Sequence, residues 1–416
     1  MSTATYLPRL VDSQLARGLR SAGAVLLEGP KACGKTSTAK QQAASAVRLD
    51  ASPRMRTAGL ADPNLLLNGD TPRLIDEWQL VPDVWNAVRA AIDDRGRDGQ
   101  FILTGSATPA EDITRHTGAM RIARVRMHPM SLYETKNSTG AASLNGLLRG
   151  ARPSSVGTDV DLMGVAELLC RGGWPSNLRR DLGDAMNANR DYLSTIAAAD
   201  IITLDGVRRD PRKVSALLFA LARSAGTYVA NRTLQTDSAG YGESMAPKTL
   251  DSYLDALARL WILVEQPAWG QHLRSAAQVR RSPKRHLVDP SLAAAAMGAT
   301  PKSLITDPEA FGQLFESLVF RDLSVYAQAN DARVFAYQDN RGAEIDAVVV
   351  KDDIWAAFEV KLSANRVVVD NAAEKLWQIA GQMRTAPVAL IVVTATGPSY
   401  RRPDGVNVVS LLDLGP

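Results

Sequence analysis

Short apolar segments near the two ends of the chain, with helical spacing between them, predict an α/β protein. In the N-terminal third, the segments 24–27, 73–76 and 100–104 have the length and apolar content of buried strands. In the middle third, apolar residues recur with the period of a helix. Helices are therefore expected at 162–170, 181–200, 211–224 and 247–260.

The last third predicts the order helix–strand–strand–strand–helix–strand. The elements are expected at 311–321, 333–338, 342–350, 355–362, 367–383 and 388–393. Because side chains alternate between the two faces of a strand, Glu344 and Asp346 share one face of theirs. Glu359 and Lys361 share a face of the next strand for the same reason.

The composition is that of an ordinary globular protein with two or three domains. Of the 416 residues, 45% are hydrophobic and 22% are charged, and the net charge of +4 only weakly favours an acidic partner. No apolar run approaches the ~20 residues that span a bilayer, and the first residues lack the pattern of a secretory signal. Two cysteines exclude a disulfide scaffold and a cysteine-rich zinc site. We therefore expect a cytoplasmic protein without a membrane partner.

The segment after the first predicted strand has the spacing of a phosphate-binding loop. Gly29 and Gly34 enclose four residues, and Lys35 and Thr36 follow before a helix. The glycines let backbone N–H groups surround a phosphate, Lys35 would reach the β- and γ-phosphates, and the Thr36 hydroxyl would bind Mg²⁺. The predicted nucleotide-binding residues are Gly29, Pro30, Lys31, Ala32, Cys33, Gly34, Lys35, Thr36 and Ser37. The chain has no guanine-reading Asn-Lys-x-Asp sequence, so ATP is expected rather than GTP.

Polar residues at the ends of the next two predicted strands extend this site. In P-loop enzymes an acid in the place of Asp76 holds the magnesium shell. A second acid directly after it, here Glu77, polarises the attacking water, so Glu77 is the predicted general base of hydrolysis. Thr104 or Ser106, at the tip of the following strand, is a candidate sensor of the γ-phosphate; a plain Thr-Gly-Ser turn is the alternative.

Arginines are concentrated in the segment 114–126. The charge on a γ-phosphate is often met by an arginine from the same or a neighbouring subunit, and Arg115 and Arg121 are the candidates. Arg124 and Arg126 alternate with apolar residues and are predicted on the wet face of a strand. An arginine acting across subunits would make the protein a homo-oligomer, which the sequence leaves open.

Five blocks occur in an order that resembles one family. They are Tyr6-Leu-Pro-Arg9, the loop from Leu27 to Thr36, Leu74-Ile-Asp-Glu-Trp-Gln79, Leu103-Thr-Gly-Ser106 and Met130-Ser-Leu-Tyr-Glu134. The chain resembles the prokaryotic AAA-type ATPases whose C-terminal half is a domain of unknown function with a restriction-endonuclease-like core. The resemblance covers nearly the whole chain and implies a P-loop NTPase fold that binds ATP. It implies no biological role, because the family is poorly characterised.

Four segments are predicted along the chain. These are a P-loop AAA-type ATPase domain at 1–135, a flexible linker at 136–160, a helical winged-helix-like connector at 161–300 and a restriction-endonuclease-like α/β domain at 301–416. The linker is predicted from its small, polar, Gly- and Pro-rich composition. The helix at 247–260 runs into a strand as in a winged helix-turn-helix, and the family resemblance implies the same module. Its acidic residues make protein docking as good an interpretation as DNA binding.

The basic segment 274–286 is the better candidate for contact with nucleic acid. The predicted phosphate contacts are Arg274, Arg280, Arg281, Lys284 and Arg285. A solvated loop is the alternative interpretation.

The C-terminal element order, with Asp346 before Glu359-x-Lys361, resembles the restriction-endonuclease-like nucleases. The resemblance implies that Asp346 and Glu359 hold Mg²⁺, that Lys361 orients or activates the attacking water, and that Glu316 adds a further metal ligand. Many members of that superfamily keep the fold and lose the chemistry. Ion pairs among these charged residues would leave a similar pattern.

Two functions follow from these observations. The first is an ATP-binding, Mg²⁺-dependent ATPase that acts on DNA, with a metal-dependent nuclease at its C-terminus. The second is a nucleotide-controlled switch or scaffold that binds ATP and a protein or DNA partner, with a catalytically silent nuclease fold.

Overall fold

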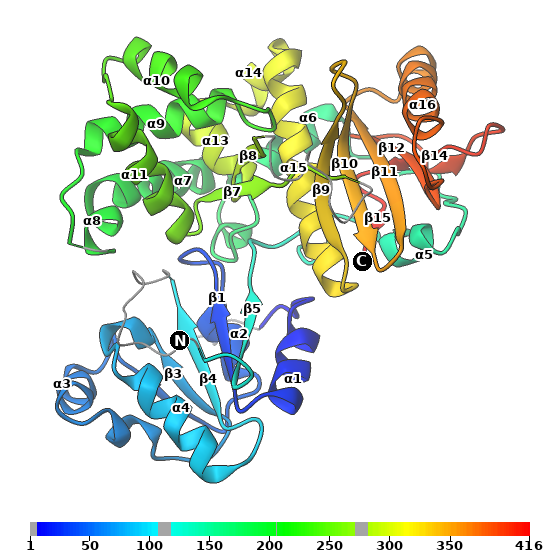
Figure 1. Cartoon of the computed structure of the whole chain (residues 1–416). Helices are drawn as coiled ribbons and strands as arrows, with labels where there is room; N and C mark the ends of the chain where they lie inside the picture. The colour runs from blue at the N-terminus through cyan, green and yellow to red at the C-terminus, as the bar shows by residue number, and fades with distance from the viewer. Residues whose placement is uncertain (1–5, 107–117, 205, 271–281) are drawn as a thin grey trace. The chain divides into compact units, whose positions relative to one another are not determined.

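The computed structural model describes residues 6–106, 118–204, 206–270 and 282–416 (Figure 1). Its tertiary contacts divide the chain into two compact units. Unit 1 comprises Met1–Pro129, Asp200–Arg208 and Ala256–Ile262, and unit 2 comprises Met130–Ala199, Arg209–Asp255 and Leu263–Pro416. Most of the predicted helical connector and all of the predicted C-terminal domain therefore lie in one unit.

Unit 1 contains a five-stranded parallel sheet in the order β2-β3-β4-β1-β5. The strands are β1 (Ala24–Glu28), β2 (Ser45–Arg48), β3 (Arg73–Asp76), β4 (Phe101–Gly105) and β5 (Ile122–Arg126). The helices include α1 (Asp12–Ser21), α2 (Lys35–Lys40), α3 (Pro53–Ala61), α4 (Val84–Arg95) and α8 (Ile201–Thr203). Every residue of β1, β3 and β4 is buried, which explains why the sequence shows them as short strand segments without alternation.

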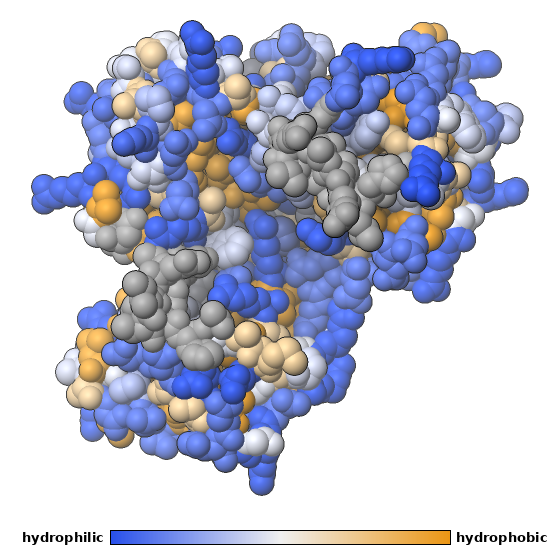
Figure 2. All heavy atoms as spheres, in the orientation of Figure 1, coloured by the Kyte–Doolittle hydropathy of each residue, from blue (hydrophilic) through white to orange (hydrophobic). Residues whose placement is uncertain are grey.

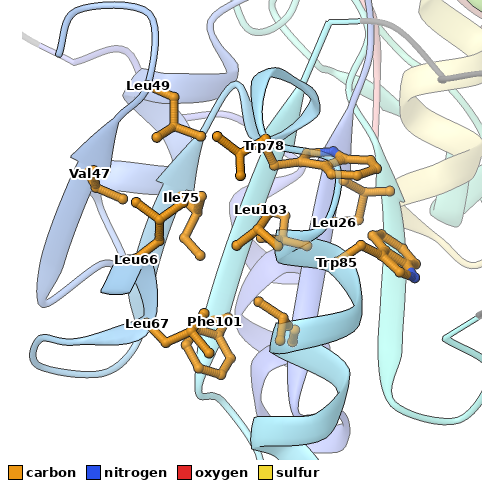
Figure 3. Close-up of a cluster of buried hydrophobic side chains, with 14 of the residues drawn as sticks. Leu26, Val47, Leu49, Leu66, Leu67, Ile75, Trp78, Trp85, Phe101 and Leu103 are labelled. Carbon is orange, nitrogen blue, oxygen red and sulfur yellow. The ribbon is translucent and has the colours of Figure 1, made fainter. Parts of the chain in front are cut away.

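A hydrophobic cluster fills one side of this sheet (Figure 3). Leu26, Ile75 and Leu103 come from neighbouring strands, and Trp78 and Trp85 lie beside them with ring centroids 5.1 Å apart. The cluster anchors the turn that follows β3, because Trp78 is the first residue of the short 3₁₀ helix Trp78–Leu80. The packing of Trp78 in this cluster therefore fixes the position of the chain directly after β3.

Unit 2 begins with a group of packed helices. They are α5 (Leu144–Leu148), α6 (Leu162–Arg171), α7 (Leu182–Thr195), α9 (Pro211–Arg223), α10 (Asn231–Gly240), α13 (Pro290–Met297) and α14 (Pro301–Thr306). Helix α13 contacts α6, α7 and α9, and its small buried residues allow this close approach. Sequence periodicity predicted α6, α7 and α9 but not α10 or α13, because α13 is apolar nearly all round and has no amphipathic pattern.

Helix α11 (Pro247–Arg259) precedes a two-stranded antiparallel hairpin of β7 (Leu263–Gln266) and β8 (Lys284–Leu287). Helices α9, α10 and α11 followed by a hairpin are the element order of a winged helix-turn-helix. The identity of this segment as such a module stays a prediction.

The rest of unit 2 is a six-stranded mixed sheet in the order β13-β14-β12-β11-β10-β9. Its elements are α15 (Pro308–Ala329), β9 (Arg333–Gln338), β10 (Glu344–Lys351), β11 (Ile354–Lys361), α16 (Arg366–Ala380), β12 (Ala389–Thr394), β13 (Tyr400–Arg401) and β14 (Asn407–Ser410). Helix α15 packs against β9, β10 and β11, and α16 packs against β11 and β12. The predicted helix–strand–strand–strand–helix–strand order is therefore present (Figure 1).

The predicted flexible linker at 136–160 is instead a folded part of unit 2. It contains α5 and the strand β6 (Ala142–Ser143), which pairs in parallel with β15 (Leu414–Gly415). The Ser138 hydroxyl also donates to the Leu414 carbonyl at 2.6 Å. Composition suggested a linker because it does not show that these small polar residues pair with a strand far away in sequence.

The surface of the drawn face is mainly hydrophilic, with hydrophobic side chains in separate patches (Figure 2). Within the described ranges, no helix has both the length and the apolar character needed to cross a membrane.

Candidate functional site

The candidate site lies at the carboxyl edge of the unit 1 sheet. Because its strands are parallel, β1, β3 and β4 all end at this edge. The register pairs Glu28, the last residue of β1, with Gly105 of β4, and Asp76, the last residue of β3, with Thr104 of β4. The loop after β1 and the polar residues at the ends of β3 and β4 therefore converge. Open parallel sheets bind their ligands at this edge.

The loop between β1 and α2 has left-handed backbone at three positions. The φ angles are 154° at Gly29, 62° at Ala32 and 105° at Gly34. A Cβ atom on Gly29 would lie 2.2 Å from the carbonyl oxygen of Met127, so this position requires glycine. The loop has the curled shape that backbone N–H groups need to surround a phosphate.

The ammonium group of Lys35 lies inside this loop. Its Nζ donates to the carbonyl oxygens of Gly29 at 2.9 Å and Pro30 at 2.8 Å, and the side chain is almost fully buried. A phosphate in the loop would be within reach of the same ammonium group.

The Asp76 carboxylate joins the phosphate loop to the sheet. Its Oδ1 accepts hydrogen bonds from the hydroxyl of Thr36, at 2.9 Å, and from the hydroxyl of Thr104. Arg48 Nε lies 3.5 Å from its other oxygen, and Asp76 is only 1% exposed. A hydroxyl and a carboxylate side by side supply hard oxygen donors, so these two residues fit the Mg²⁺ ion that usually accompanies a bound nucleotide.

Glu77 has left-handed backbone, with φ 58° and ψ 49°. This conformation is costly for a residue with a Cβ atom and turns the chain sharply after β3. The Glu77 Oε2 accepts hydrogen bonds from Ser106 Oγ at 3.0 Å and Gln79 Nε2 at 2.5 Å. The two proposed sensors thus contact the two carboxylates: Thr104 contacts Asp76, and Ser106 contacts Glu77.

Two contacts to the loop were missed in the sequence. Arg9 donates from Nη1 to the Cys33 carbonyl and from Nη2 to the His128 carbonyl, each at 2.8 Å, and so ties the loop to the chain after β5. Lys31 Nζ lies 2.5 Å from Asp200 Oδ1. Arg9 stands in the first block of the family resemblance, which is the signal that could have identified it. Asp200 gives no signal in the sequence.

The remaining predicted loop residues differ in exposure. Cys33 is fully buried, whereas Ala32 and Ser37 are exposed.

The prediction that Arg121 meets a γ-phosphate bound by its own chain is wrong. Arg121 precedes β5, and the register pairs Ile122 with Ala24 at the amino end of β1, opposite the phosphate loop. Its Nε is 2.6 Å from Asp93 Oδ1. The concentration of arginines in the sequence could not reveal which end of the sheet Arg121 occupies. Arg115 lies outside the described residues.

A second charged group lies in unit 2, around Lys284. Lys284 Nζ is 2.7 Å from Glu316 Oε1 on α15 and 3.8 Å from Asp346 Oδ1 on β10. The Asp346 Oδ2 accepts a hydrogen bond from the backbone N–H of Val360 at 2.7 Å. Burial alone would lower the pKa of Lys284, but the charges of Glu316 and Asp346 outweigh it and raise that pKa. Burial, and then the Asp346 charge, raise the pKa of Glu316 to about 8.

Glu359 has different partners from Glu316. Its Oε1 lies 2.8 Å from Lys361 Nζ and 2.7 Å from Lys375 Nζ of α16. Its Oε2 is buried without a hydrogen-bond partner among the described residues. Burial, and then the Asp346 charge, raise the pKa of Glu359.

The three predicted metal carboxylates already have partners within the fold. Each of Glu316, Asp346 and Glu359 already has a lysine ammonium group or a backbone N–H on at least one oxygen. The described residues contain no group of three or more metal-type side chains arranged to hold an ion. Mg²⁺ needs only one or two carboxylates beside its waters, so metal binding by these residues stays a prediction.

Two of the five predicted phosphate contacts have partners within unit 2. Lys284 is 2% exposed and paired with Glu316, so it is not a surface residue. Arg285 donates to Asn231 Oδ1 at 2.7 Å and lies 3.5 Å from Glu265 Oε1, so its guanidinium is engaged within unit 2. Charge clustering suggested contact with phosphates, because it does not show that the Lys284 side chain points toward Glu316 of α15. Arg274, Arg280 and Arg281 lie outside the described residues.

Comparison with known families gives three matches along the chain. Residues 21–136 match a family described as an AAA domain. Residues 164–303 and 311–414 match two domains of unknown function, DUF8612 and DUF4143. Unit 1 therefore contains an AAA-type P-loop ATPase domain, and nucleotide binding follows from that fold.

Similar individual proteins include uncharacterized proteins of Mycobacterium bovis and Mycobacterium tuberculosis. Each is 26% identical over 353 residues, which cover 84% of this chain and 72% of the relative. Among solved structures, a Walker-type ATPase of Pyrococcus abyssi has a TM-score of 0.44 at 16% identity and covers 70% of this chain and 96% of that one.

Proposed function

We propose that this protein is a Mg²⁺-dependent ATPase that hydrolyses ATP at the carboxyl edge of the unit 1 sheet. We propose further that it acts as a nucleotide-controlled switch. The observation that carries the proposal is the 2.9 Å contact between the Thr36 hydroxyl and the Asp76 carboxylate. Residues 36 and 76 are far apart in sequence. The start of α2 and the end of β3 bring together at one edge of the sheet the side chains that a nucleotide-bound magnesium ion needs.

Each side chain has a separate task in this proposal. Lys35 binds the β- and γ-phosphates from inside the loop. Thr36 and Asp76 hold Mg²⁺, which when bound supplies charge neutralisation at those phosphates. Glu77 accepts the proton of the attacking water. The hydrogen bonds from Ser106 and Gln79 hold its carboxylate in one orientation, which is what a general base requires.

Of the two functions suggested by the sequence, the switch is favoured over the nuclease. Cleavage of DNA by unit 2 would need a divalent cation among Glu316, Asp346 and Glu359, and lysine ammonium groups contact these carboxylates instead. A protein or DNA partner of the switch remains part of the proposal. So does a homo-oligomer in which Arg121 or Arg115 acts on the ATP of a neighbouring copy.

The experiment is ATP binding and turnover by the full chain with three substitutions. Lys35→Ala is expected to abolish binding. Glu77→Gln is expected to bind ATP with unchanged affinity and to lose turnover by about 100-fold or more, the usual effect of a general base. Asp83→Asn is the control, because it removes an exposed acidic group just beyond the site. Wild-type turnover in Glu77→Gln would refute the general base, and no Mg²⁺-dependent turnover in the wild type would refute the function.

A DNA cleavage assay with Mg²⁺ or Mn²⁺ tests whether unit 2 is a nuclease or a catalytically silent nuclease fold. No cleavage is expected. Cleavage that is lost in Lys361→Ala would instead establish the nuclease.

A further inference from the structure

A buried lysine lies among the carboxylates at the place where a metal-dependent nuclease would hold its cation. Lys284 comes from the β7–β8 hairpin, whereas Glu316 and Asp346 come from α15 and β10. The lysine is 2% exposed, so its ammonium group has exchanged water for these two carboxylates. A buried ammonium group is tolerated only when such partners compensate its charge.

The direction of Lys284 follows from strand alternation on β8. Lys284 and His286 lie on one face, and both contact α15: Lys284 contacts Glu316, and the His286 Nδ1 lies 2.9 Å from Ser317 Oγ. Arg285, between them, faces the opposite way toward Asn231. The face of β8 that carries Lys284 and His286 contacts α15 through these side chains, and this directs one ammonium group into the acidic cluster as part of the fold.

Lysine ammonium groups already lie beside the carboxylates of the cluster. Lys284 is within 4 Å of Glu316 and Asp346, and Lys361 and Lys375 are within 4 Å of Glu359. A divalent cation beside Asp346 would be repelled by the Lys284 ammonium group across a medium that screens poorly.

We propose that Lys284 is the resident cation of this cluster, and that the cluster therefore binds no divalent metal. Lys284 takes the place of a metal ion and joins the β7–β8 hairpin to the C-terminal sheet. This inference rests on the proposed switch function and deepens it. It makes unit 2 a binding module with a catalytically silent nuclease fold.

The test is Mn²⁺ binding to the full chain without nucleotide, measured by electron paramagnetic resonance and by thermal shift. Wild type and Asp346→Asn are expected to give the same Mn²⁺ isotherm at millimolar metal, because Asp346 contributes no site. A stoichiometric Mn²⁺ site in the wild type that disappears in Asp346→Asn would overturn the proposal. Glu359→Gln repeats the comparison through the other cluster carboxylate, should Asp346→Asn fail to fold.

Lys284→Met tests whether removal of the ammonium group creates a Mn²⁺ site. Without the ammonium group, the two carboxylates are expected to gain one Mn²⁺ site, which is lost again in the double variant with Asp346→Asn. Lys284→Arg, which keeps the charge, should gain none. A folded Lys284→Met protein with no new site would show that the lysine does not exclude the metal and would overturn the proposal. ATP turnover measured on the same samples tests the phosphate loop separately, so failure of either proposal is recognised independently.

Discussion

The neutral imidazole of His286 makes unit 2 sensitive to mild acid. His286 is 1% exposed, its Nδ1 and Nε2 are bonded to Ser317 and Gln266, and its ring stacks on Phe320 at 4.2 Å between centroids. Burial, and then the charge of Lys284, lower its pKa from 6.5 to about 3. The basic segment around His286 does not reveal in the sequence that this pKa is lowered, because a solvated histidine in such a segment would keep its ordinary pKa.

The sign of the effect follows from proton binding. Below pH 6.5 the unfolded chain takes up a proton at this histidine, and the folded chain does not until the pH approaches 3, so the free energy of unfolding falls with pH in that window. Between pH 7 and pH 5 the loss from this one group is about 2 kcal/mol.

The assay compares wild type with His286→Gln, which keeps a polar group beside Ser317 and Gln266 but cannot titrate. Urea unfolding at pH 7 and pH 5 should show a drop in the free energy of unfolding that is larger in wild type by about 2 kcal/mol. In NMR spectra, the ring signal that disappears in His286→Gln should not titrate between pH 8 and pH 5. Equal drops in both proteins, or a ring that titrates near pH 6.5, would refute the reasoning.

Two further substitutions test the fold around the two sites. Gly29→Ala should abolish nucleotide binding, because its Cβ atom would lie 2.2 Å from the Met127 carbonyl oxygen; Gly240→Ala, which meets nothing within 4 Å, is the control, and equal ATP affinity in both would contradict the loop geometry. Arg321 of α15 pairs with the buried carboxylates of Asp289 at 3.0 Å and Asp322 at 2.6 Å. Arg321→Met should therefore lower the free energy of unfolding by about 3–5 kcal/mol, because it leaves two buried charges without this ion-pair partner. Urea unfolding checks this, and a loss below 1 kcal/mol would mean that the aspartates are compensated otherwise.

The nucleotide loop is the part of the site that local sequence predicted well. The positive φ angles of Gly29 and Gly34 and the position of Lys35 in the loop are local consequences of a glycine-spaced motif between a strand and a helix. The apolar strands β1, β3 and β4 were predicted within one or two residues, because burial on both faces requires nearly continuous apolar residues. The proximity of Asp76 to Thr36 could be expected from the motif, but its geometry comes from the sheet register.

The charged residues of unit 2 show where local sequence reasoning fails. Lys284, Arg285 and His286 form one basic run in the sequence, yet one is an ion-pair partner inside an acidic cluster, one is held by Asn231, and one is neutral. They differ because only one face of β8 points its side chains toward α15, and no local pattern encodes that.

Local sequence patterns were enough to predict the elements whose burial or backbone geometry is local: the phosphate loop, the strands around it and the order of the last elements. The partners of the ionisable side chains became known from the folded chain alone. A hydrophobic pattern records whether a residue is buried, because that depends on its own side chain. The pairing of Lys284 with Glu316, the distance of Arg121 from the phosphate loop and the strand formed by Ala142–Ser143 depend on segments far away in the chain, and their charges and polar groups match many alternatives equally well until the fold selects one.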